Sequence, residues 1–409
     1  MSSYLDHLNT DIFESIRSEV PDAIMGKERY LLIAEVLDKM GPESAEELTD
    51  FVHALLQHMT TIDASDIDLG GSGCLEKVWY RVFGQKRPWG DGPTISRFCS
   101  DVLCVSILTA DMLDTLLENR NLDFSYTANA GTSSESRFRA DMYFDLEHLA
   151  LNMRKVNSEV RPFKNLKLHP EVAKALSLKY LKYGLTLVTG ITGSGKSSTL
   201  DTIIDANNRS VDGHIVIISS PIEMIHVPKR CIVRHREVGR DTMSFKVGAI
   251  EALRQDPDII VIGELRDAET IMTALEITDS GHKTFSTLHT ASATESIDRI
   301  IGEVPSTEQD RVRNRLADVL TCVISQKLVP TVDGKLVMAK EVLLNTTSIK
   351  SAIRNNNTGE IYQMLMEGGN VGMLTLEQDL KRLYEEGIIS LEEAYNQANN
   401  KKKLKDIIN

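Results

Sequence analysis

The spacing of apolar positions changes along the 409-residue chain, and these changes divide it into parts. Over residues 1–58 apolar residues recur near every 3.6 positions, as between Leu31 and Met40, which predicts helices with a break at Gly41. Over residues 59–155 short strand-like stretches and turns replace this period and indicate an α+β domain. The strands expected there are 65–69, 78–83 and 136–144, with a helix near 109–119. We therefore expect a helical amino-terminal extension followed by a small α+β domain.

Beyond a polar stretch at 156–162, which is the expected linker, strand and helix patterns alternate. Apolar runs of strand length are separated by helix-length segments, and this is the pattern of buried parallel strands joined by crossover helices. The expected strands are 185–189, 214–218, 258–262 and 283–288. The sequence thus predicts an α/β domain over 156–345. Helical patterns dominate the final region, 346–409.

Composition limits the class of protein. A net charge of −13 argues against a nucleic-acid-coating protein, because affinity for a phosphate backbone needs a basic surface, so no direct nucleic-acid partner is expected. The basic run 401–405 is expected to be a solvated helix end, with membrane-surface or nucleic-acid contact as the alternative. The apolar runs are too short to cross a bilayer and the amino terminus lacks a signal-peptide pattern, so we expect a cytosolic protein. The five cysteines have no paired spacing, which favours reduced thiols.

A glycine-rich loop joins strand 185–189 to a helix-forming stretch. It begins at Gly190 and ends in Lys196-Ser197, with the spacing G-x-x-x-x-G-K-S. In this context backbone N–H groups surround a polyphosphate, Lys196 reaches the β- and γ-phosphates and the Ser197 hydroxyl ligates Mg²⁺. The alternative is a glycine-rich turn with a surface lysine. The residues expected to bind the nucleotide are Thr192, Gly193, Ser194, Gly195, Lys196, Ser197 and Ser198.

Two further side chains follow strands of the same predicted sheet. Glu264 comes just after strand 258–262, and ligands of open α/β sheets lie at the carboxyl ends of the strands, so this carboxylate should face Mg²⁺ and the attacking water. The alternative is a surface glutamate beside local pairs formed by Arg266 and Asp267. His289 follows strand 283–288 and is expected to contact a γ-phosphate, or else to be a structural histidine.

Together these segments resemble the bacterial type IV pilus and secretion ATPases, and among them most of all the pilus retraction ATPases. The resemblance spans roughly residues 60–395. The segments that carry it are the phosphate loop, 252–270, 281–301 and 136–144. It implies a hexameric ring of subunits, each with a PAS-like first domain and a RecA-like second domain, with ATP and Mg²⁺ between them.

The resemblance also implies roles for individual residues. Glu264 corresponds to the Walker B carboxylate and His289 to the histidine-box residue. Arg137 and Arg139 fit the position from which the first domain reaches the γ-phosphate, and their alternative is exposed charge on an edge strand. Including Glu223, the expected catalytic residues are Glu264, Glu223, His289, Arg137 and Arg139.

One segment departs from the family pattern. Where the family reads Glu-Asp-Pro-Ile-Glu, this chain has Ser219 and Ser220 before Pro-Ile, and only Glu223 remains acidic. Hydroxyls donate hydrogen bonds but are not general bases at neutral pH, so slow hydrolysis is expected. The four-cysteine metal site of pilus assembly ATPases is missing, which makes an assembly motor less expected. The segment 352–357 resembles a retraction-specific segment of the family, with its last three residues altered.

The function implied is a motor of a type IV pilus system that powers retraction. Its expected partners are further copies of this chain in a homohexamer and an inner-membrane pilus or secretion platform protein, so it would lie in the cytoplasm at the inner membrane. Two alternatives stay open. One is a conjugation or type IV secretion ATPase, and the other is a slow or non-hydrolysing ring component that works with an active paralogue.

Overall fold

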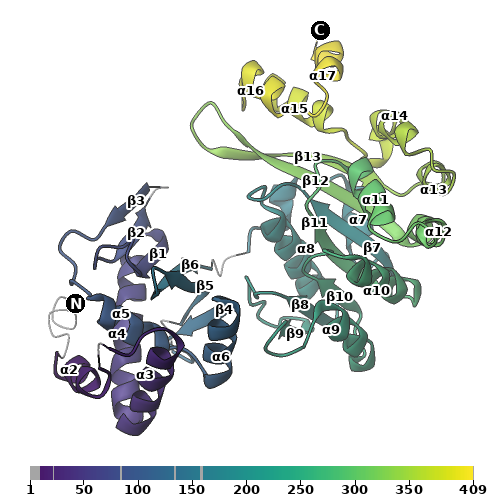
Figure 1. The fold of residues 1–409 in the computed structure, drawn as a ribbon. Coiled ribbons are helices and arrows are strands. Elements are labelled where there is room, and N and C mark those ends of the chain that lie inside the picture. The colour runs from purple at the N-terminus through teal and green to yellow at the C-terminus, as the bar shows by residue number, and fades with distance from the viewer. Residues whose placement is uncertain (1–9, 22, 83–84, 133–134, 157–159, 409) are drawn as a thin grey trace. The chain divides into compact units, whose positions relative to one another are not determined.

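The computed structural model describes residues 10–21, 23–82, 85–132, 135–156 and 160–408, and it divides into two compact units, 1–157 and 158–409 (Figure 1). The expected helix over residues 1–9 and residues 157–159 of the expected linker lie outside the described residues. Each unit has its own sheet and its own hydrophobic core.

The first unit contains an antiparallel sheet of six strands in the order β3-β2-β1-β6-β5-β4. The strands are β1 (Ala64–Gly70), β2 (Trp79–Val82), β3 (Gln85–Pro88), β4 (Asn121–Ala128), β5 (Ser136–Asp145) and β6 (His148–Lys155). The helices are α2 (Thr10–Glu19), α3 (Gly26–Met40), α4 (Pro42–Thr61), α5 (Arg97–Ser106) and α6 (Ala110–Asn119). The predicted mixture of helices and short strands is confirmed here.

The first helices share their core with this sheet. Leu55 and Met59 of α4 are fully buried and belong to the same cluster as Ile67 of β1. The hydroxyl of Tyr80 in β2 donates a hydrogen bond of 3.0 Å to the Leu55 carbonyl. The structure thus groups the described helices α2 to α4 with the sheet that follows, whereas the sequence suggested a separate extension, because the apolar stripe of α4 packs against strands.

The second unit is built on a seven-stranded sheet in the order β13-β12-β7-β11-β10-β8-β9, parallel except for β13. Its strands are β7 (Gly184–Thr189), β8 (Gly213–Ser219), β9 (Cys231–Glu237), β10 (Ile259–Ile262), β11 (Lys283–Leu288), β12 (Leu320–Pro330) and β13 (Leu336–Leu344). The four predicted parallel strands are confirmed as β7, β8, β10 and β11. Strands β9, β12 and β13 were not predicted.

A helix follows each strand of this unit except β8 and β12. The helices are α7 (Pro170–Leu176), α8 (Lys196–Ser210), α9 (Phe245–Ala252), α10 (Ala268–Asp279), α11 (Ala293–Gly302), α12 (Gln309–Val319), α13 (Thr347–Arg354), α14 (Ile361–Glu367), α15 (Leu376–Glu385), α16 (Leu391–Gln397) and α17 (Lys401–Ile408). Short 3₁₀ turns lie at Phe163–Leu166, Leu253–Gln255, Thr358–Glu360 and Gly368–Val371. Helices over 346–409 were predicted, and the structure places them in the same unit as the sheet.

Both faces of this sheet are covered. Along β10, Ile259 and Val261 join the cluster that contains α7 and α8, while Ile260 and Ile262 join the cluster that contains α9 to α14. Alternate side chains of a strand point to opposite faces, so a strand covered on both faces is apolar at every position. This explains the continuous apolar run in the sequence and confirms the doubly covered α/β architecture.

The carboxy-terminal helices are attached to β12 through Lys327. Its Nζ donates hydrogen bonds of 2.8 Å both to the Gln397 carbonyl, at the end of α16, and to Asn399 Oδ1. The Asn399 amide group donates in turn to the Ala291 carbonyl at 3.0 Å. The end of α16 is therefore fastened both to the sheet and to the loop before α11.

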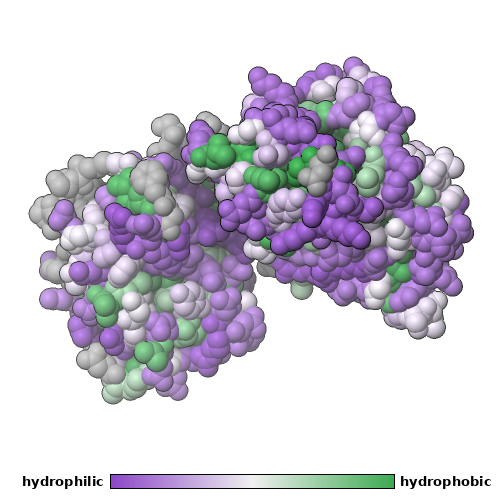
Figure 2. All heavy atoms as spheres, turned by 90° about the horizontal axis from the view of Figure 1, so that it is seen from above, coloured by the Kyte–Doolittle hydropathy of each residue, from purple (hydrophilic) through white to green (hydrophobic). Residues whose placement is uncertain are grey.

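Among the described residues no helix is long and apolar enough to cross a membrane. Figure 2 shows hydrophilic residues over most of the face drawn, with hydrophobic residues in small groups between them. The five cysteines are free thiols, and three of them are buried.

Candidate functional site

The glycine-rich loop connects β7 to α8 at the carboxyl end of the parallel strands. A Cβ at Gly190 would lie 2.4 Å from Ser194 Oγ and 2.5 Å from the Gln326 carbonyl, so only glycine fits there. Gly195 is the N-cap of α8 in the left-handed region (φ 84°) and provides no side-chain cap. The first N–H groups of this 15-residue helix are therefore available to an anion, and the helix dipole favours one there.

The side chains of the loop fit a nucleotide phosphate and its metal ion. Thr192, Ser197 and Ser198 are exposed, and the buried Ser194 Oγ has no hydrogen-bond partner in the described structure. A hydroxyl is the ligand that a phosphate-bound Mg²⁺ takes from this position, and Ser197 is placed to supply it. The geometry of the loop is compatible with the predicted cradle, and nucleotide binding by these particular residues stays a prediction.

Lys196 is buried against its own loop. Its Nζ donates hydrogen bonds to the carbonyls of Gly190 at 2.8 Å and Ile191 at 3.0 Å. Burial lowers the pKa of Lys196, while the negative charges of Glu264 and Glu223 raise it. The ammonium is thus held in place at the loop, with two carboxylates within electrostatic reach.

The structure brings Lys196, His289 and Glu264 together, although they lie far apart in sequence. Lys196 Nζ is 3.5 Å from His289 Nδ1, and His289 Nε2 is 3.2 Å from Glu264 Oε1. The lysine can only donate and the carboxylate can only accept, so His289 carries its proton on Nε2 and accepts at Nδ1. These three residues form one polar line from the phosphate loop to the end of β10.

The environment keeps His289 neutral. Burial lowers its pKa most, the positive charge of Lys196 lowers it further, and Glu264 opposes both. A neutral imidazole is the form that the polar line requires. Glu264 also pairs with Arg266 at 2.8 Å, so the local pairing that was the alternative interpretation of this glutamate exists beside the contact with His289.

The altered acidic segment begins at the carboxyl end of β8. A Cβ at Gly263 would lie 3.2 Å from Ser219 Oγ, so Ser219 is next to the residue that precedes Glu264. Ser220 is exposed, and Glu223 lies in the segment that follows. The serines therefore occupy the same edge of the sheet as the polar line.

Arg137 and Arg139 lie on β5 of the first unit. Arg139 forms an ion pair with Asp123 of the neighbouring strand β4 at 3.4 Å, and both side chains are nearly half exposed. The alternative to a phosphate-binding role was exposed charge on an edge strand, but β5 lies between β4 and β6 and is not an edge strand. A contact between these arginines and a γ-phosphate stays a prediction.

One supporting residue of the phosphate loop was missed. Gln326 in β12 donates a hydrogen bond from Nε2 to the Ser194 carbonyl at 2.7 Å, and the preceding Ser325 bonds to Thr189 Oγ1 at 2.7 Å. Both contacts depend on β12 lying beside β7, which no local pattern revealed. The loop is thus supported from a strand more than a hundred residues later.

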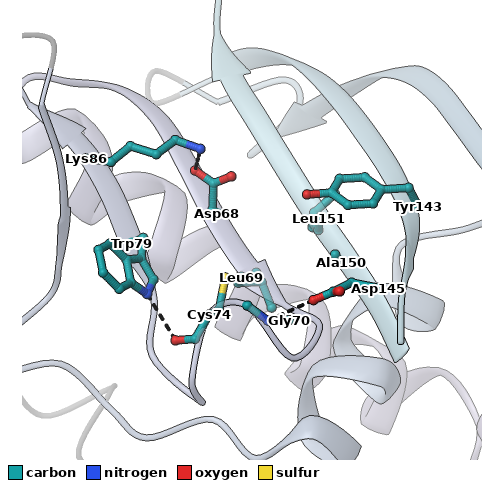
Figure 3. A pocket seen from close by; sticks show the side chains of 11 residues that line it. Asp68, Leu69, Gly70, Cys74, Trp79, Lys86, Tyr143, Asp145, Ala150 and Leu151 are labelled. Carbon is teal, nitrogen blue, oxygen red and sulfur yellow. Dashed lines mark hydrogen bonds and ion pairs between the residues drawn. The ribbon is translucent and has the colours of Figure 1, made fainter. Parts of the chain in front are cut away.

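A separate pocket of about 280 Å³ lies at the sheet of the first unit (Figure 3). Asp68 pairs with Lys86 at 2.7 Å, and Trp79 Nε1 donates to the Cys74 carbonyl at 3.0 Å. Asp145 accepts a hydrogen bond of 2.7 Å from the Gly73 N–H. Since these polar groups are satisfied within the protein, no ligand chemistry is assigned to the pocket.

Comparison with known proteins identifies the family of the chain. The family model described as "Type II/IV secretion system protein" matches residues 43–408, so the match begins within α4 rather than near residue 60. The type IV pilus retraction ATPase PilT of Pseudomonas aeruginosa is 39% identical over 289 residues, 70% of this chain and 83% of that protein. The type IV pilus ATPase PilU of the same organism is 37% identical over 292 residues, covering 71% and 75%.

A solved structure is similar as well. The crystal structure of the pilus retraction motor PilT with bound ADP superposes with a TM-score of 0.78 at 35% identity, covering 87% of this chain and 99% of that one. The predicted PAS-like and RecA-like arrangement agrees with this match. The chain therefore belongs to the type II/IV secretion system protein family and is an ATPase of that family.

Proposed function

We propose that this chain is a Mg-ATP-driven motor of a type IV pilus system that powers pilus retraction. The observation that carries the proposal is the polar line Lys196–His289–Glu264 beside an intact phosphate loop. The similarity to a retraction ATPase over most of both chains supports the direction of the work. Among the described residues, no other group of side chains combines a phosphate cradle with a carboxylate at a strand end.

Each residue has a part in this proposal. The loop amides and Lys196 hold the phosphates, and Ser197 would hold Mg²⁺, which supplies positive charge that offsets the charge on the phosphates. Glu264 orients the attacking water and accepts its proton. His289 reports the state of the phosphate site to Glu264, because it contacts both ends of the polar line.

The assembly is part of the same proposal. We infer a homohexamer that binds a platform protein at the inner membrane from the cytoplasmic side, without direct contact with nucleic acid. In such a ring, Arg137 and Arg139 of the first unit would complete a γ-phosphate site. The net charge of −13 supports a protein partner rather than a nucleic acid.

The test combines turnover with retraction. Purified protein should release phosphate from Mg-ATP, and Lys196→Ala should not, because the charge on the β- and γ-phosphates is removed. The parent and Lys196→Ala are then each expressed in a Pseudomonas aeruginosa strain that lacks PilT. The parent should restore surface twitching, and Lys196→Ala should not. A parent that turns over ATP without restoring twitching would favour a secretion or conjugation role, which the neighbouring genes would then identify.

The serines favour one second candidate function. With Ser219 and Ser220 in place of carboxylates, the chain would be a slow ring component that assembles with an active paralogue. Its nearly equal identity to PilT and to PilU, two ATPases of one organism, is compatible with this role. The parent protein would then bind ATP, release no phosphate when it is alone, and release phosphate when it is mixed with an active paralogue. That result would establish this role.

A further inference from the structure

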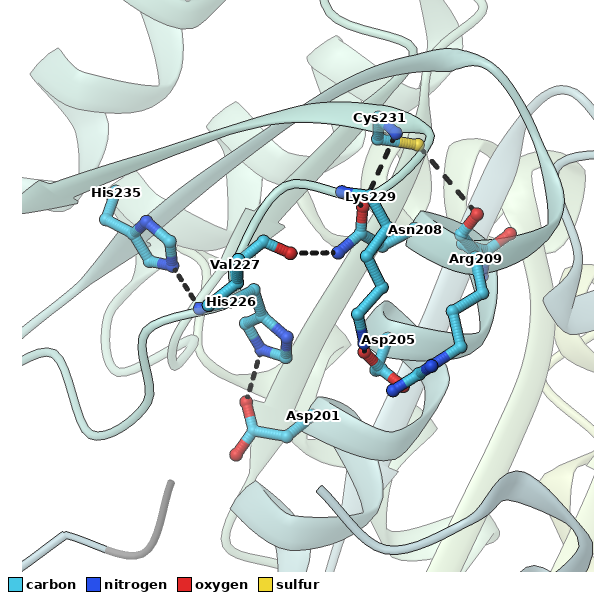
Figure 4. Close-up of polar contacts among 10 residues, drawn as sticks. Asp201, Asp205, Asn208, Arg209, His226, Val227, Lys229, Cys231 and His235 are labelled. Carbon is cyan, nitrogen blue, oxygen red and sulfur yellow. Dashed lines mark hydrogen bonds and ion pairs between the residues drawn. The ribbon is translucent and has the colours of Figure 1, made fainter. Parts of the chain in front are cut away.

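The segment between β8 and β9 is fastened to the side of α8 (Figure 4). Asn208 Nδ2 donates to the Val227 carbonyl at 2.9 Å, and its Oδ1 accepts from the Lys229 N–H at 3.0 Å. Lys229 Nζ forms an ion pair with Asp205 at 2.6 Å. These contacts hold the far end of the segment to the last turns of the helix.

A fourth contact lies closer to the phosphate loop. His226 Nε2 is 3.0 Å from Asp201 Oδ1, and the histidine side chain is 1% exposed. The His226 backbone N–H donates to His235 Nε2 at 3.0 Å, and the two rings stack with centroids 6.1 Å apart. Because His226 donates to a carboxylate through Nε2, the buried Nδ1 is left as an acceptor without a partner. A buried histidine held on two sides fixes its own backbone.

Both members of this contact lie close in sequence to the phosphate site. Asp201 comes one helical turn after Ser197, and Glu223 comes three residues before His226. Burial raises the pKa of Asp201, the His226 hydrogen bond lowers it, and the charge of Glu223 raises it. The same Glu223 charge acts on Lys196. Glu223 is thus within electrostatic reach of both groups on α8.

We propose that Asp201 and His226 are positioning residues that hold Glu223 at the phosphate end of α8. This inference rests on the proposed ATP hydrolysis. Glu223 matters here because residues 219 and 220 are serines. Glu223 is therefore the one carboxylate of residues 219–223, and no acidic neighbour can take over its role. Glu223 lies between the end of β8 and His226, and His226 is bonded to the helix that also carries Lys196.

The test compares steady-state turnover by rings of the full chain. Asp201→Ala should lower kcat about 10- to 100-fold with KM nearly unchanged, the order of loss that misplacing a group by about 1 Å produces. Asp201→Asn keeps an oxygen that accepts from His226 and should retain most of the rate. Asp205→Ala is the matched control, because it releases Lys229 of the same segment from the same helix, and it should behave like the parent.

A double-mutant cycle shows whether the effect passes through Glu223. Glu223→Gln alone should be slow, and adding Asp201→Ala should cause little further loss, whereas independent roles would give additive losses. His226→Phe replaces Asp201→Ala if Asp201→Ala does not fold. It retains the ring stacking and removes the hydrogen bond, so it should show the loss of kcat that is expected for Asp201→Ala.

The outcomes separate this inference from the proposed function. A parent without ATPase activity would contradict the proposed function itself. An active parent in which Asp201→Ala and His226→Phe turn over normally would overturn the inference alone. An equal loss in Asp205→Ala, or losses additive with Glu223→Gln, would also overturn it, because general tethering of the segment would then be the cause.

Discussion

Glu264 carries two interactions at once, with His289 at 3.2 Å and with Arg266 at 2.8 Å. The first points toward the phosphate loop and the second toward solvent. A side chain divided in this way is held in one orientation, which is what a residue that orients water requires. At the scale of single residues we therefore predict that turnover depends on the negative charge of Glu264 and not only on its shape.

Glu264→Gln tests this dependence. The amide oxygen still accepts from His289, so nucleotide affinity should stay near that of the parent, whereas turnover should fall about 10²- to 10⁴-fold with the loss of the base. Phosphate release and binding of a fluorescent ATP analogue measure the two effects. Glu269→Gln, an exposed glutamate on α10, is the control. If Glu264→Gln cycles like the parent, the base lies elsewhere.

For Ser219 and Ser220 we predict the opposite effect, namely that replacing them raises the rate of ATP hydrolysis. Ser219→Glu together with Ser220→Asp restores two carboxylates at the sheet edge beside Gly263, where they can order metal-bound water. Phosphate release at saturating Mg-ATP should rise by about tenfold or more, while binding stays constant because the loop is unchanged. Folding and ring size are checked first. A fast parent and an equally fast double variant would show that the departure has no catalytic meaning.

At the scale of elements, Glu341 of β13 connects the sheet to the start of α11. It accepts a hydrogen bond of 2.7 Å from the Ala293 N–H and is buried. Burial raises its pKa to about 7, opposed by the backbone hydrogen bonds from Ala293 and Leu376. The carboxyl is therefore partly protonated in the folded protein near neutral pH, while it is ionised in the unfolded chain.

This shift predicts a pH dependence of stability. Between about pH 4.5 and 7 the folded protein binds more protons at Glu341 than the unfolded chain, so the free energy of unfolding falls as pH rises. Glu341→Gln keeps an acceptor for Ala293 and removes that slope, up to ~1.4 kcal/mol per pH unit. Urea midpoints of the parent and the variant, measured from pH 4.5 to 8, should diverge as the pH rises to about 7 and differ by a constant amount above it. Glu392→Gln, at an exposed position, should leave the slope intact.

The elements and site residues that local patterns specify were predictable. A run such as Ile259–Ile262 and the loop ending in Lys196 are defined by neighbours in sequence. That Glu264 and His289 lie at one edge of the sheet could be predicted because parallel strands end at a common edge, while their catalytic roles stay predictions. Gln326 and the contact between Asp201 and His226 were not predictable, since each depends on how distant segments pack.

Three strands of the second unit, β9, β12 and β13, could also not be predicted from local sequence patterns. Strand β9 carries exposed charge at Arg234, and β12 mixes buried apolar residues with buried polar ones such as Ser325 and Gln326. Those polar residues are buried because they bond to the phosphate loop and its strand. A polar residue that serves a site interrupts the apolar run by which a strand is recognised.

At the scale of the whole molecule, the prediction is a ring of six chains. The arginines of β5 can act on a γ-phosphate only when a first unit closes over a second unit, in the same chain or in a neighbour. Light scattering should give six times the chain mass of 45.6 kDa. Arg137→Ala with Arg139→Ala should assemble normally and hydrolyse slowly. A strictly monomeric protein with full activity would contradict the ring.

Strand β12 carries Gln326 and Lys327 side by side. Gln326 holds the phosphate loop through Ser194, while Lys327 points to the other face and holds the end of α16. Neighbouring residues of one hydrogen-bonded strand cannot shift independently. A displacement of the phosphate loop that preserves both contacts therefore moves the carboxy-terminal helices as well. Mechanical coupling between the nucleotide site and the carboxy-terminal helices is thus built into two adjacent residues of β12.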